Sequence, residues 1–270
     1  MRRAVCLLAA LLACSCARHG LKLPTGAGEP APDGREALAQ ATASCAAIRT
    51  FSAEVRLSGK IQGQRLRAHL LVGAAAPASA RVEAVAPIGA PIFIFAARAG
   101  DATLVMPRDN RVLEHARPEE VLGAIAGVPL NAEELRLTLT GCWPSDPPVG
   151  GARRFGDTWR VVDVAEKDIV TLHRPRTVDP WRIVAAEHHD TQGGRWQATY
   201  DDFQSDLPHA IRISSAGAGS GSAYDLQLAL SQVETNVPLD DDVFRVKIPG
   251  DAAPISLDEL RHARPGAREN

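Results

Sequence analysis

The chain has 270 residues, of which 45% are hydrophobic, and a formal net charge of -2. This length and apolar content are sufficient for one sizeable hydrophobic core. Because the charge is close to zero, the composition argues against a nucleic-acid-binding protein.

The N-terminal residues have the features of an export signal. Arg2 and Arg3 are followed by residues 4–13, which include no charged side chain. This apolar run has about half the length of the roughly 20 residues that a helix needs to span a bilayer. We therefore predict that residues 1–13 are a signal peptide that is removed on export.

A cysteine at the end of this signal is predicted to carry a lipid anchor. Residues 11–14 (Leu-Leu-Ala-Cys) resemble a bacterial lipobox, in which the cysteine is acylated and becomes the mature N-terminus. Residues 13–16 also fit, and processing there would leave an even number of cysteines in the body. Leu11 favours Cys14, with Cys16 as the alternative and an ordinary secretory signal as a third interpretation.

The anchor determines the expected location. Several acyl chains on one residue hold a protein to a membrane far better than one chain, since each buried methylene contributes about 0.8 kcal/mol. Ser15, which follows Cys14, is not an acidic residue of the kind associated with inner-membrane retention. We therefore expect the protein on the periplasmic face of the outer membrane, attached through its N-terminal lipid.

The organisation of the chain after the anchor follows from its composition. Residues 14–34 are rich in Pro and Gly and predict a flexible tether. Residues 35–48 have apolar side chains on one helical face and predict an opening helix. We expect residues 35–262 to form a single domain and residues 263–270 a C-terminal tail.

Short strands in succession dominate this domain. Residues 51–58 alternate between apolar and polar side chains, as a half-buried strand does. The short spacing of the strands favours an antiparallel meander, because parallel strands need long crossover connections. The expected strands are 51–58, 66–72, 82–86, 92–97, 103–106, 111–113 and, after a Pro- and Gly-rich link at 144–151, 159–161, 169–173, 181–187, 196–200, 209–213, 224–230 and 244–248.

One region departs from simple alternation. A short turn at 86–91 precedes the apolar run 92–97, which does not alternate. Two amphipathic segments, 118–126 and 131–140, then predict helices that cover the apolar side of the strands. A short terminal helix is expected at 256–262.

Two cysteines of the body are candidates for a disulfide. Cys45 belongs to the opening helix, and Cys142 follows the second amphipathic segment. An oxidising cell envelope permits them to pair, whereas two buried thiols are the alternative, since a sequence does not measure their separation.

A succession of segments resembles a known family. The segments are 81–89, 102–104, 118–122, 127–130 and 135–141, followed by 195–203 and 207–211. Their order is similar to that in LolB, the family of outer-membrane lipoprotein receptors. The resemblance implies a mainly β, α+β fold: a half-open antiparallel β-barrel of LolA/LolB type, with helices covering the open side of an apolar cavity for acyl chains. The C-terminal segment 243–249 departs from this family and is more similar to the carrier LolA or to related envelope lipoproteins.

The resemblance also implies a function. The protein would receive lipoproteins from a LolA-like periplasmic carrier and deliver them to the outer membrane. The turn Pro87-Ile88-Gly89 would enter the membrane, with Ile88 at the position of an exposed hydrophobic residue in LolB. For the aromatic cavity candidates, ordinary core packing is the alternative. The cavity-lining candidates are Ile92, Phe93, Ile94, Phe95, Leu122, Ile125, Leu135, Trp159, Trp181 and Trp196.

The sequence contains no motif that predicts catalysis. It has no Gly-x-Ser-x-Gly, His-Glu-x-x-His, phosphate-loop or Cys-x-x-Cys pattern. Residues 188–190 (His-His-Asp), with His173, are the best metal candidate, but neighbours on a strand point to opposite faces. We therefore expect no metal, no cofactor and no enzyme, and a monomer that binds acyl chains. A non-enzymatic envelope sensor or assembly factor that binds a protein partner is the alternative function.

Overall fold

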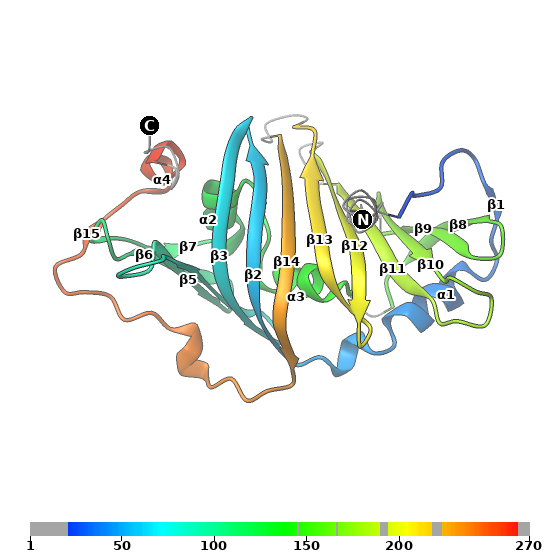
Figure 1. Cartoon of the computed structure of the whole chain (residues 1–270), viewed down its shortest axis with the longest axis horizontal. Helices are drawn as coiled ribbons and strands as arrows, with labels where there is room; N and C mark the ends of the chain where they lie inside the picture. Colours follow the sequence, from blue (N-terminus) through cyan, green and yellow to red (C-terminus); the bar gives the residue numbers. More distant parts are fainter. Residues whose placement is uncertain (1–20, 145, 166, 190–193, 218–222, 264–270) are drawn as a thin grey trace, which may run out of the picture.

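The protein forms one large β-sheet with helices on it (Figure 1). The structure is a computed structural model, and it describes residues 21–263 except 145, 166, 190–193 and 218–222. The described strands form a 15-stranded sheet in the order β1-β8-β9-β10-β11-β12-β13-β14-β2-β3-β4-β5-β6-β7-β15. Its neighbours are antiparallel except for the edge pair of β15 and β7. The expected open antiparallel α+β architecture is therefore confirmed.

The elements follow one another with short connections. The strands are β1 (Glu29–Pro30), β2 (Thr50–Ile61), β3 (Gln64–Ala75), β4 (Ser79–Val85), β5 (Phe93–Arg98), β6 (Asp101–Met106), β7 (Arg111–Ala116), β8 (Val149–Phe155), β9 (Trp159–Val164), β10 (Asp168–His173), β11 (Arg182–His189), β12 (Arg195–Gln204), β13 (Leu207–Ser215), β14 (Tyr224–Thr235) and β15 (Ala253–Pro254). The helices are α1 (Gly34–Thr42), α2 (Pro118–Ala126), α3 (Ala132–Thr140) and α4 (Leu257–Ala263), with 3-10 turns η2 (Cys45–Ala47) and η3 (Asp241–Phe244).

The long hairpin of β2 and β3 shows why the sequence forms this sheet. Its strands pair from Thr50 with Ala75 to Ile61 with Gln64. The two residues of the turn between them have positive φ angles, as the turns that suit the twist of a hairpin require. Phe51, Ala53 and Val55 are buried and alternate with more exposed residues. One face of the hairpin therefore belongs to the core.

Helices α2 and α3 lie against the apolar face of β2, β3 and β14 (Figure 1). Pro118 occupies the first turn of α2, and Gly127 ends the helix in the left-handed conformation. Asn131 and Glu134 form a capping box at the start of α3, with bonds of 2.8 and 2.9 Å. These local signals explain why both helices were predicted within one residue of their ends.

Three elements differ from the prediction. The opening helix breaks after Thr42, whose hydroxyl donates back to the carbonyl of Leu38 at 3.0 Å, and continues as η2. Residues 149–155, expected to begin within a link, form β8 beside β9. Residues 244–248 form no strand, because they run outside the sheet, where Arg81 donates to the carbonyls of Val243 and Arg245 at 3.2 and 3.3 Å.

The C-terminal end of the expected tether is attached to the sheet. Residues 29 and 30 form β1 beside β8. Arg160, whose side chain is 7% exposed, donates two hydrogen bonds of 2.8 Å to the carboxylate of Asp33. These bonds hold the pKa of Asp33 below its ordinary value. The chain is therefore fixed to the sheet by Asp33, just before α1.

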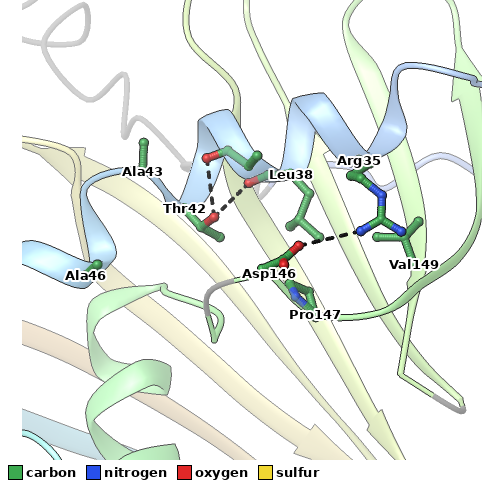
Figure 2. A pocket seen from close by; sticks show the side chains of 9 residues that line it. Arg35, Leu38, Thr42, Ala43, Ala46, Asp146, Pro147 and Val149 are labelled. Carbon is green, nitrogen blue, oxygen red and sulfur yellow. Dashed lines mark hydrogen bonds and ion pairs between the residues drawn. The ribbon is translucent and has the colours of Figure 1, made fainter.

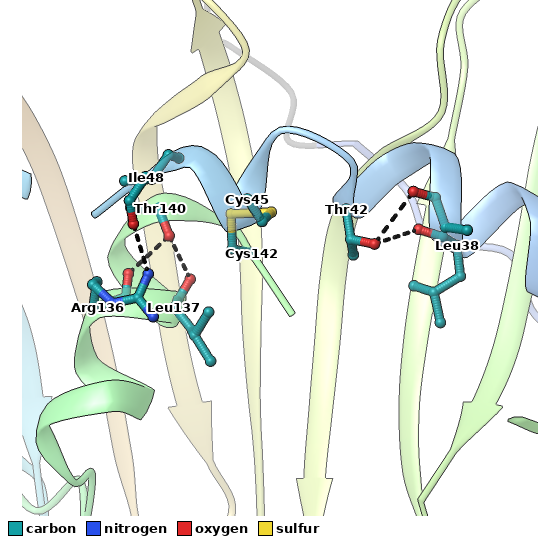
Figure 3. The surroundings of a disulfide bond; sticks show 9 residues. Leu38, Thr42, Cys45, Ile48, Arg136, Leu137, Thr140 and Cys142 are labelled. Atoms are coloured by element: carbon teal, nitrogen blue, oxygen red, sulfur yellow. Dashed lines mark hydrogen bonds between the residues drawn. A yellow bond between two sulfur atoms is a disulfide. The ribbon is translucent and has the colours of Figure 1, made fainter. Parts of the chain in front are cut away.

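Cys45 and Cys142 are joined by a disulfide in the structure (Figure 3). Their Cα atoms are 5.7 Å apart, although 97 positions separate them in the sequence. The bond connects η2 to the residue two positions after α3. Close to it, Arg136 of α3 donates to the carbonyl of Ile48 at 3.2 Å. One end of α3 is therefore attached to the chain that enters β2.

This attachment gives the first testable prediction. We expect alkylation under denaturing, non-reducing conditions to add no label to a chain whose other cysteines, Cys6, Cys14 and Cys16, are replaced by Ser. Replacing Cys45 and Cys142 by Ala should lower the free energy of unfolding by up to about 4.7 kcal/mol, the chain-entropy value for a closed loop of about 100 residues. Two added labels, or a double variant as stable as the oxidised parent, would contradict the prediction.

Candidate functional site

The sheet and helices α2 and α3 enclose an apolar cavity of about 120 Å³. Strands β2, β3, β4, β5 and β14 form one wall, and the two helices with their connecting loop form the other. Every residue of the lining is hydrophobic, so its side chains offer no strong hydrogen-bonding group. On β3 the lining residues are Leu66, Ala68, Leu70 and Val72, which share one face of the strand.

Along β3, the lining becomes more exposed toward the β2–β3 turn. Val72 of β3 is 6% exposed, whereas Leu66, Ala68 and Leu70 are only half-buried. Leu66 lies closest to the turn, since β3 begins at Gln64. The cavity is therefore less covered near this turn on its β3 side, whereas Leu57 of β2 and Leu226 of β14 stay buried.

The structure places four of the ten cavity candidates in the lining. These are Phe93, Leu122, Ile125 and Leu135. On β5, Phe95 is buried in the core, and Ile94 points to the opposite face from Phe93. Ile92, just before β5, is also outside the lining. The continuous apolar run is thus explained by a strand with both faces partly covered, and only one of its side chains reaches the cavity.

The three tryptophan candidates are not in the lining either, because they lie in the other half of the sheet. Trp181 is 5% exposed and packs beneath the guanidinium groups of Arg160 and Arg174, at 4.9 and 4.3 Å from its ring. Trp159 contacts the ring of His173, with centroids 4.2 Å apart. Trp196 stacks on His188 at 4.1 Å. Ordinary core packing, the alternative interpretation, therefore describes Trp181 and Trp196, whereas Trp159 is half-buried and lies outside the core.

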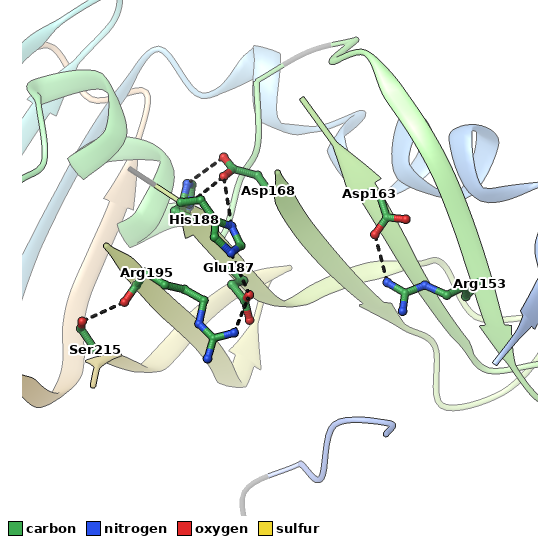
Figure 4. A network of polar contacts seen from close by, with 8 residues as sticks. Arg153, Asp163, Asp168, Glu187, His188, Arg195 and Ser215 are labelled. Carbon is green, nitrogen blue, oxygen red and sulfur yellow. Dashed lines mark hydrogen bonds and ion pairs between the residues drawn. The ribbon is translucent and has the colours of Figure 1, made fainter. Parts of the chain in front are cut away.

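His188 belongs to a polar network beside this packing (Figure 4). Its second ring face stacks on Trp143 at 4.7 Å, and its Nδ1 lies 3.3 Å from the carboxylate of Asp168. Burial pushes the pKa of Asp168 upward, but the bonds from His188 and from the backbone N–H of His189 outweigh burial and lower it. The aspartate therefore stays charged and fixes the histidine between two indole rings.

The described part of this network contains no metal-binding cluster. Among the described residues, no group of three or more His, Cys, Asp or Glu side chains could hold a metal ion. His173 contacts Trp159 on a different strand from His188. Asp190, the third member of the sequence motif, lies outside the described residues.

The turn at 86–92 connects β4 to β5 and exposes one large apolar side chain. Ile88 is 86% exposed at its tip, and Gly89 follows with a φ of +85°. Arg108, in the neighbouring turn between β6 and β7, donates to the carbonyl oxygens of Ile88 and Ala90 at 2.9 and 3.1 Å. One guanidinium thus satisfies two backbone acceptors of the turn, and the isoleucine side chain stays in solvent.

This turn is at the same end of the sheet as the less covered β3 side of the cavity, which we call its mouth. Successive turns of an antiparallel meander alternate between its two ends, so the β2–β3, β4–β5 and β6–β7 turns share one end. The turn at 174–181, with Val178 also 86% exposed, joins β10 to β11 at the opposite end. The mouth and Ile88 therefore face the same direction.

A second hollow, beside α1, has a different character (Figure 2). It has a volume of about 240 Å³, and Arg35 and Asp146 form an ion pair of 3.6 Å across it. Their side chains are 60% and 92% exposed, so the pair is in water. Charged and polar residues belong to the lining of this hollow, whereas the cavity beneath α2 and α3 is lined by hydrophobic residues alone.

The predicted anchor cannot be placed in this geometry. Cys14 and Cys16 lie outside the described residues. Within the part of the chain that is described, no helix is long and apolar enough to cross a bilayer.

The fold is shared with proteins of known structure. No protein-family model matches the sequence, and no curated protein does. A LolA superfamily protein from Nitrosomonas europaea is similar at a TM-score of 0.54 and 16% identity, over 79% of this chain and 97% of that chain. A domain from Vibrio parahaemolyticus, named after outer membrane lipoprotein sorting, has a TM-score of 0.52 and 14% identity, over 78% and 96% of the two chains. A DUF1329 family protein from Desulfovibrio piger has the same TM-score, 0.52, at 11% identity, over 80% and 98%.

These likenesses define the class of the fold. All three solved structures are covered almost completely by this chain. The chain therefore has a LolA-type fold, as the sequence resemblance to the LolA/LolB superfamily implied. At 11–16% identity, the likeness concerns the architecture alone.

The contact between Arg108 and the Ile88 turn gives a testable prediction. In Arg108→Met, we expect the amide of Ile92, which donates to the carbonyl of Ala84 at 2.8 Å, to exchange with solvent about tenfold faster, because a hydrogen bond from a charged donor contributes on the order of 1.5 kcal/mol. Hydrogen–deuterium exchange of the peptide that contains Ile92 measures the effect. Arg176→Met is the control, because Arg176 bonds to Asp179 in the turn at the opposite end. Unchanged exchange in Arg108→Met would show that Arg108 does not hold the turn.

Proposed function

We propose that this protein is a lipid-anchored protein of the outer membrane that binds acyl chains of lipoproteins or lipids and delivers them to that membrane. The acyl chain enters between the sheet and helices α2 and α3. The observation that carries the proposal is the cavity lined wholly by hydrophobic residues, whose β3 side is less covered at the same end of the sheet that carries the exposed Ile88. The LolA-type fold, shared with a domain named after lipoprotein sorting, supports it.

The chemistry of the lining suits a hydrocarbon chain. Moving an acyl chain from water to an apolar site contributes about 0.8 kcal/mol per methylene, so ten methylenes contribute on the order of 8 kcal/mol as an upper bound. Such binding needs no polar contact and tolerates different cargo. Transfer can then follow relative affinity, from a LolA-like periplasmic carrier to this protein and on to the membrane.

The size of the cavity indicates that binding requires movement of the helices. A dry apolar cavity of about 150 Å³ holds a molecule the size of benzene. At about 120 Å³ the present cavity accommodates only part of an acyl chain. Helices α2 and α3 contact the lining through Leu122, Ile125 and Leu135, and an outward shift of these side chains would lengthen the cavity.

The turn at 86–92 is assigned to membrane contact. Ile88 is the part of the turn that would enter the bilayer, with Pro87 and Gly89 on either side of it. Backbone acceptors are costly to bury in lipid unless the protein satisfies them, and Arg108 satisfies those of Ile88 and Ala90. Cys14, or Cys16 in its place, would keep the protein at the membrane between transfers.

The cavity is tested by filling it. In Ala68→Phe, we expect the affinity for a fluorescent fatty acid to fall about tenfold or more, because the added ring occupies space that the chain would use. Leu71→Phe is the matched control, since Leu71 lies on the opposite face of the same strand and is 42% exposed. Circular dichroism establishes that both variants fold. If Ala68→Phe binds the fatty acid as tightly as the parent does, the site is rejected. If the parent binds no acyl chain and captures a protein partner instead, the alternative function of an envelope sensor or assembly factor is favoured.

The tip is tested by adding a charge to it. Ile88→Glu should leave the melting temperature unchanged, because the side chain is 86% exposed, and should reduce delivery of an acylated cargo to liposomes at least tenfold. Val178→Glu makes the same change at an equally exposed site at the opposite end. Delivery by Ile88→Glu at the parental rate would refute the assignment of the tip.

A further inference from the structure

The end of the sheet that carries Ile88 also carries exposed cationic side chains that form no ion pair with a described residue. Lys60 and Arg65 lie directly opposite each other on β2 and β3, and Arg67 is opposite Ser58 on the same face. All three are exposed, and none makes an ion pair or side-chain hydrogen bond with a described residue. Arg108 lies in the nearby β6–β7 turn, bonded to carbonyl groups only. We call these four residues the basic rim.

The basic rim is close to the apolar tip. His69 and Val85 are the last pair of β3 and β4 before the tip. Arg67 precedes His69 by two residues, and Ile88 follows Val85 by three. Because the two strands are antiparallel, both residues lie on the same side of this pair. The side chains of β3 alternate here: Leu66 and Ala68 face the cavity, while Arg65 and Arg67 face outward. Cations therefore flank both the mouth and the tip.

The acidic side chains at this end do not neutralise the rim. Asp225 lies opposite Lys60 on β14, but its carboxylate accepts two hydrogen bonds from Arg212, at 2.7 and 2.8 Å. Glu259 accepts from Arg111 at 3.3 Å, whereas Asp251 accepts only from the neutral Asn110, at 3.2 Å, and keeps its charge. Asp109 is exposed beside Arg108. The four cations of the rim therefore outnumber Asp109 and Asp251, and an excess of positive charge remains.

Such an arrangement costs stability in the free protein. Like charges directly opposite each other on neighbouring strands repel, as Lys60 and Arg65 do. An anionic surface would relieve the repulsion. An apolar tip beside several cations is also the combination that attaches proteins to acidic bilayers, since insertion and charge attraction act together.

We infer that the basic rim binds the headgroups of anionic glycerophospholipids while Ile88 enters the bilayer, so that delivery is directed to acidic membrane surfaces. The inference rests on the proposed function, because it assigns the lipid class to the same tip. The headgroup phosphates accept hydrogen bonds from Arg65 and Arg67, and Lys60 contributes a further charge. The guanidinium of Arg108 holds the turn and places its charge at the lipid surface.

Vesicle binding tests this inference. The full chain with Cys14→Ser and Cys16→Ser is used, so that no acyl anchor contributes, and its flotation is compared on phosphatidylcholine vesicles with and without phosphatidylglycerol. We expect tighter binding to the anionic vesicles and loss of the difference at high salt. Arg65→Glu/Arg67→Glu should weaken binding to the anionic vesicles about tenfold or more and leave binding to pure phosphatidylcholine unchanged.

A matched control makes the same change in net charge elsewhere. Arg49→Glu/Lys247→Glu replaces two exposed cations, one at the opposite end of β2 and one after η3, and should bind like the parent. Equal binding of the parent to both vesicle types, or parental binding by Arg65→Glu/Arg67→Glu, would overturn the inference. The inference would also be overturned if Arg65→Glu/Arg67→Glu lost binding to an acidic protein but kept parental binding to the anionic vesicles. Binding of a fluorescent fatty acid, measured in parallel, reports separately on the proposed function.

Discussion

An antiparallel sheet that is apolar on one face and does not close must have that face covered by other elements, and this constraint governs the molecule. Strands β2 and β3 have 12 residues each and extend about 40 Å at about 3.3 Å per residue. Helices α2 and α3 have nine residues each and extend only about 14 Å at 1.5 Å per residue. Two short helices therefore cover only part of the strands and leave Leu66, Ala68 and Leu70 of β3 half-buried.

Different kinds of side chain pack on the inner face of the two halves of the sheet. Around β9 to β12, aromatic rings and planar cations fill the space, as Trp181 does beneath Arg160 and Arg174 and as His188 does between Trp143 and Trp196. Around β2 to β5, the inner face carries mostly aliphatic side chains and Ala68. The hollow lined wholly by hydrophobic residues lies where the aliphatic half meets the helices. The hollows beside the aromatic half have charged and polar residues in their lining, such as Asp206 in one and Asp168 in the other.

The predictable parts of the fold were those with local signals. The alternation from Phe51 to Ser58 predicts one buried strand face, and the capping box at Asn131 predicts where α3 begins. The start of β8 has no such signal, because Gly150 and Gly151 are typical of a link. Contacts distant in the sequence fix this strand: it pairs with β9, and Arg153 donates a hydrogen bond to Asp163. The prediction that Trp159, Trp181 and Trp196 line the cavity was wrong for a related reason. A large apolar ring predicts burial, but only the fold determines whether the ring lines a cavity or packs in the core. Phe93, Leu122, Ile125 and Leu135 reach the cavity because their elements face it.

The molecule has chemically distinct ends, although each exposes one large aliphatic side chain. At one end, Val178 belongs to a turn whose Arg176 is neutralised by Asp179. At the other end, Ile88 lies beside the mouth of the apolar cavity, and the nearby Arg65 and Arg67 have no acidic partner among the described residues. In the proposed transfer, an acyl chain would pass directly from the cavity to the bilayer interior only if the membrane already lies against the mouth of the cavity. Cations that hold an acidic bilayer against the mouth would reduce the hydrocarbon exposed to water during transfer, and that exposure is the main barrier to moving a lipid.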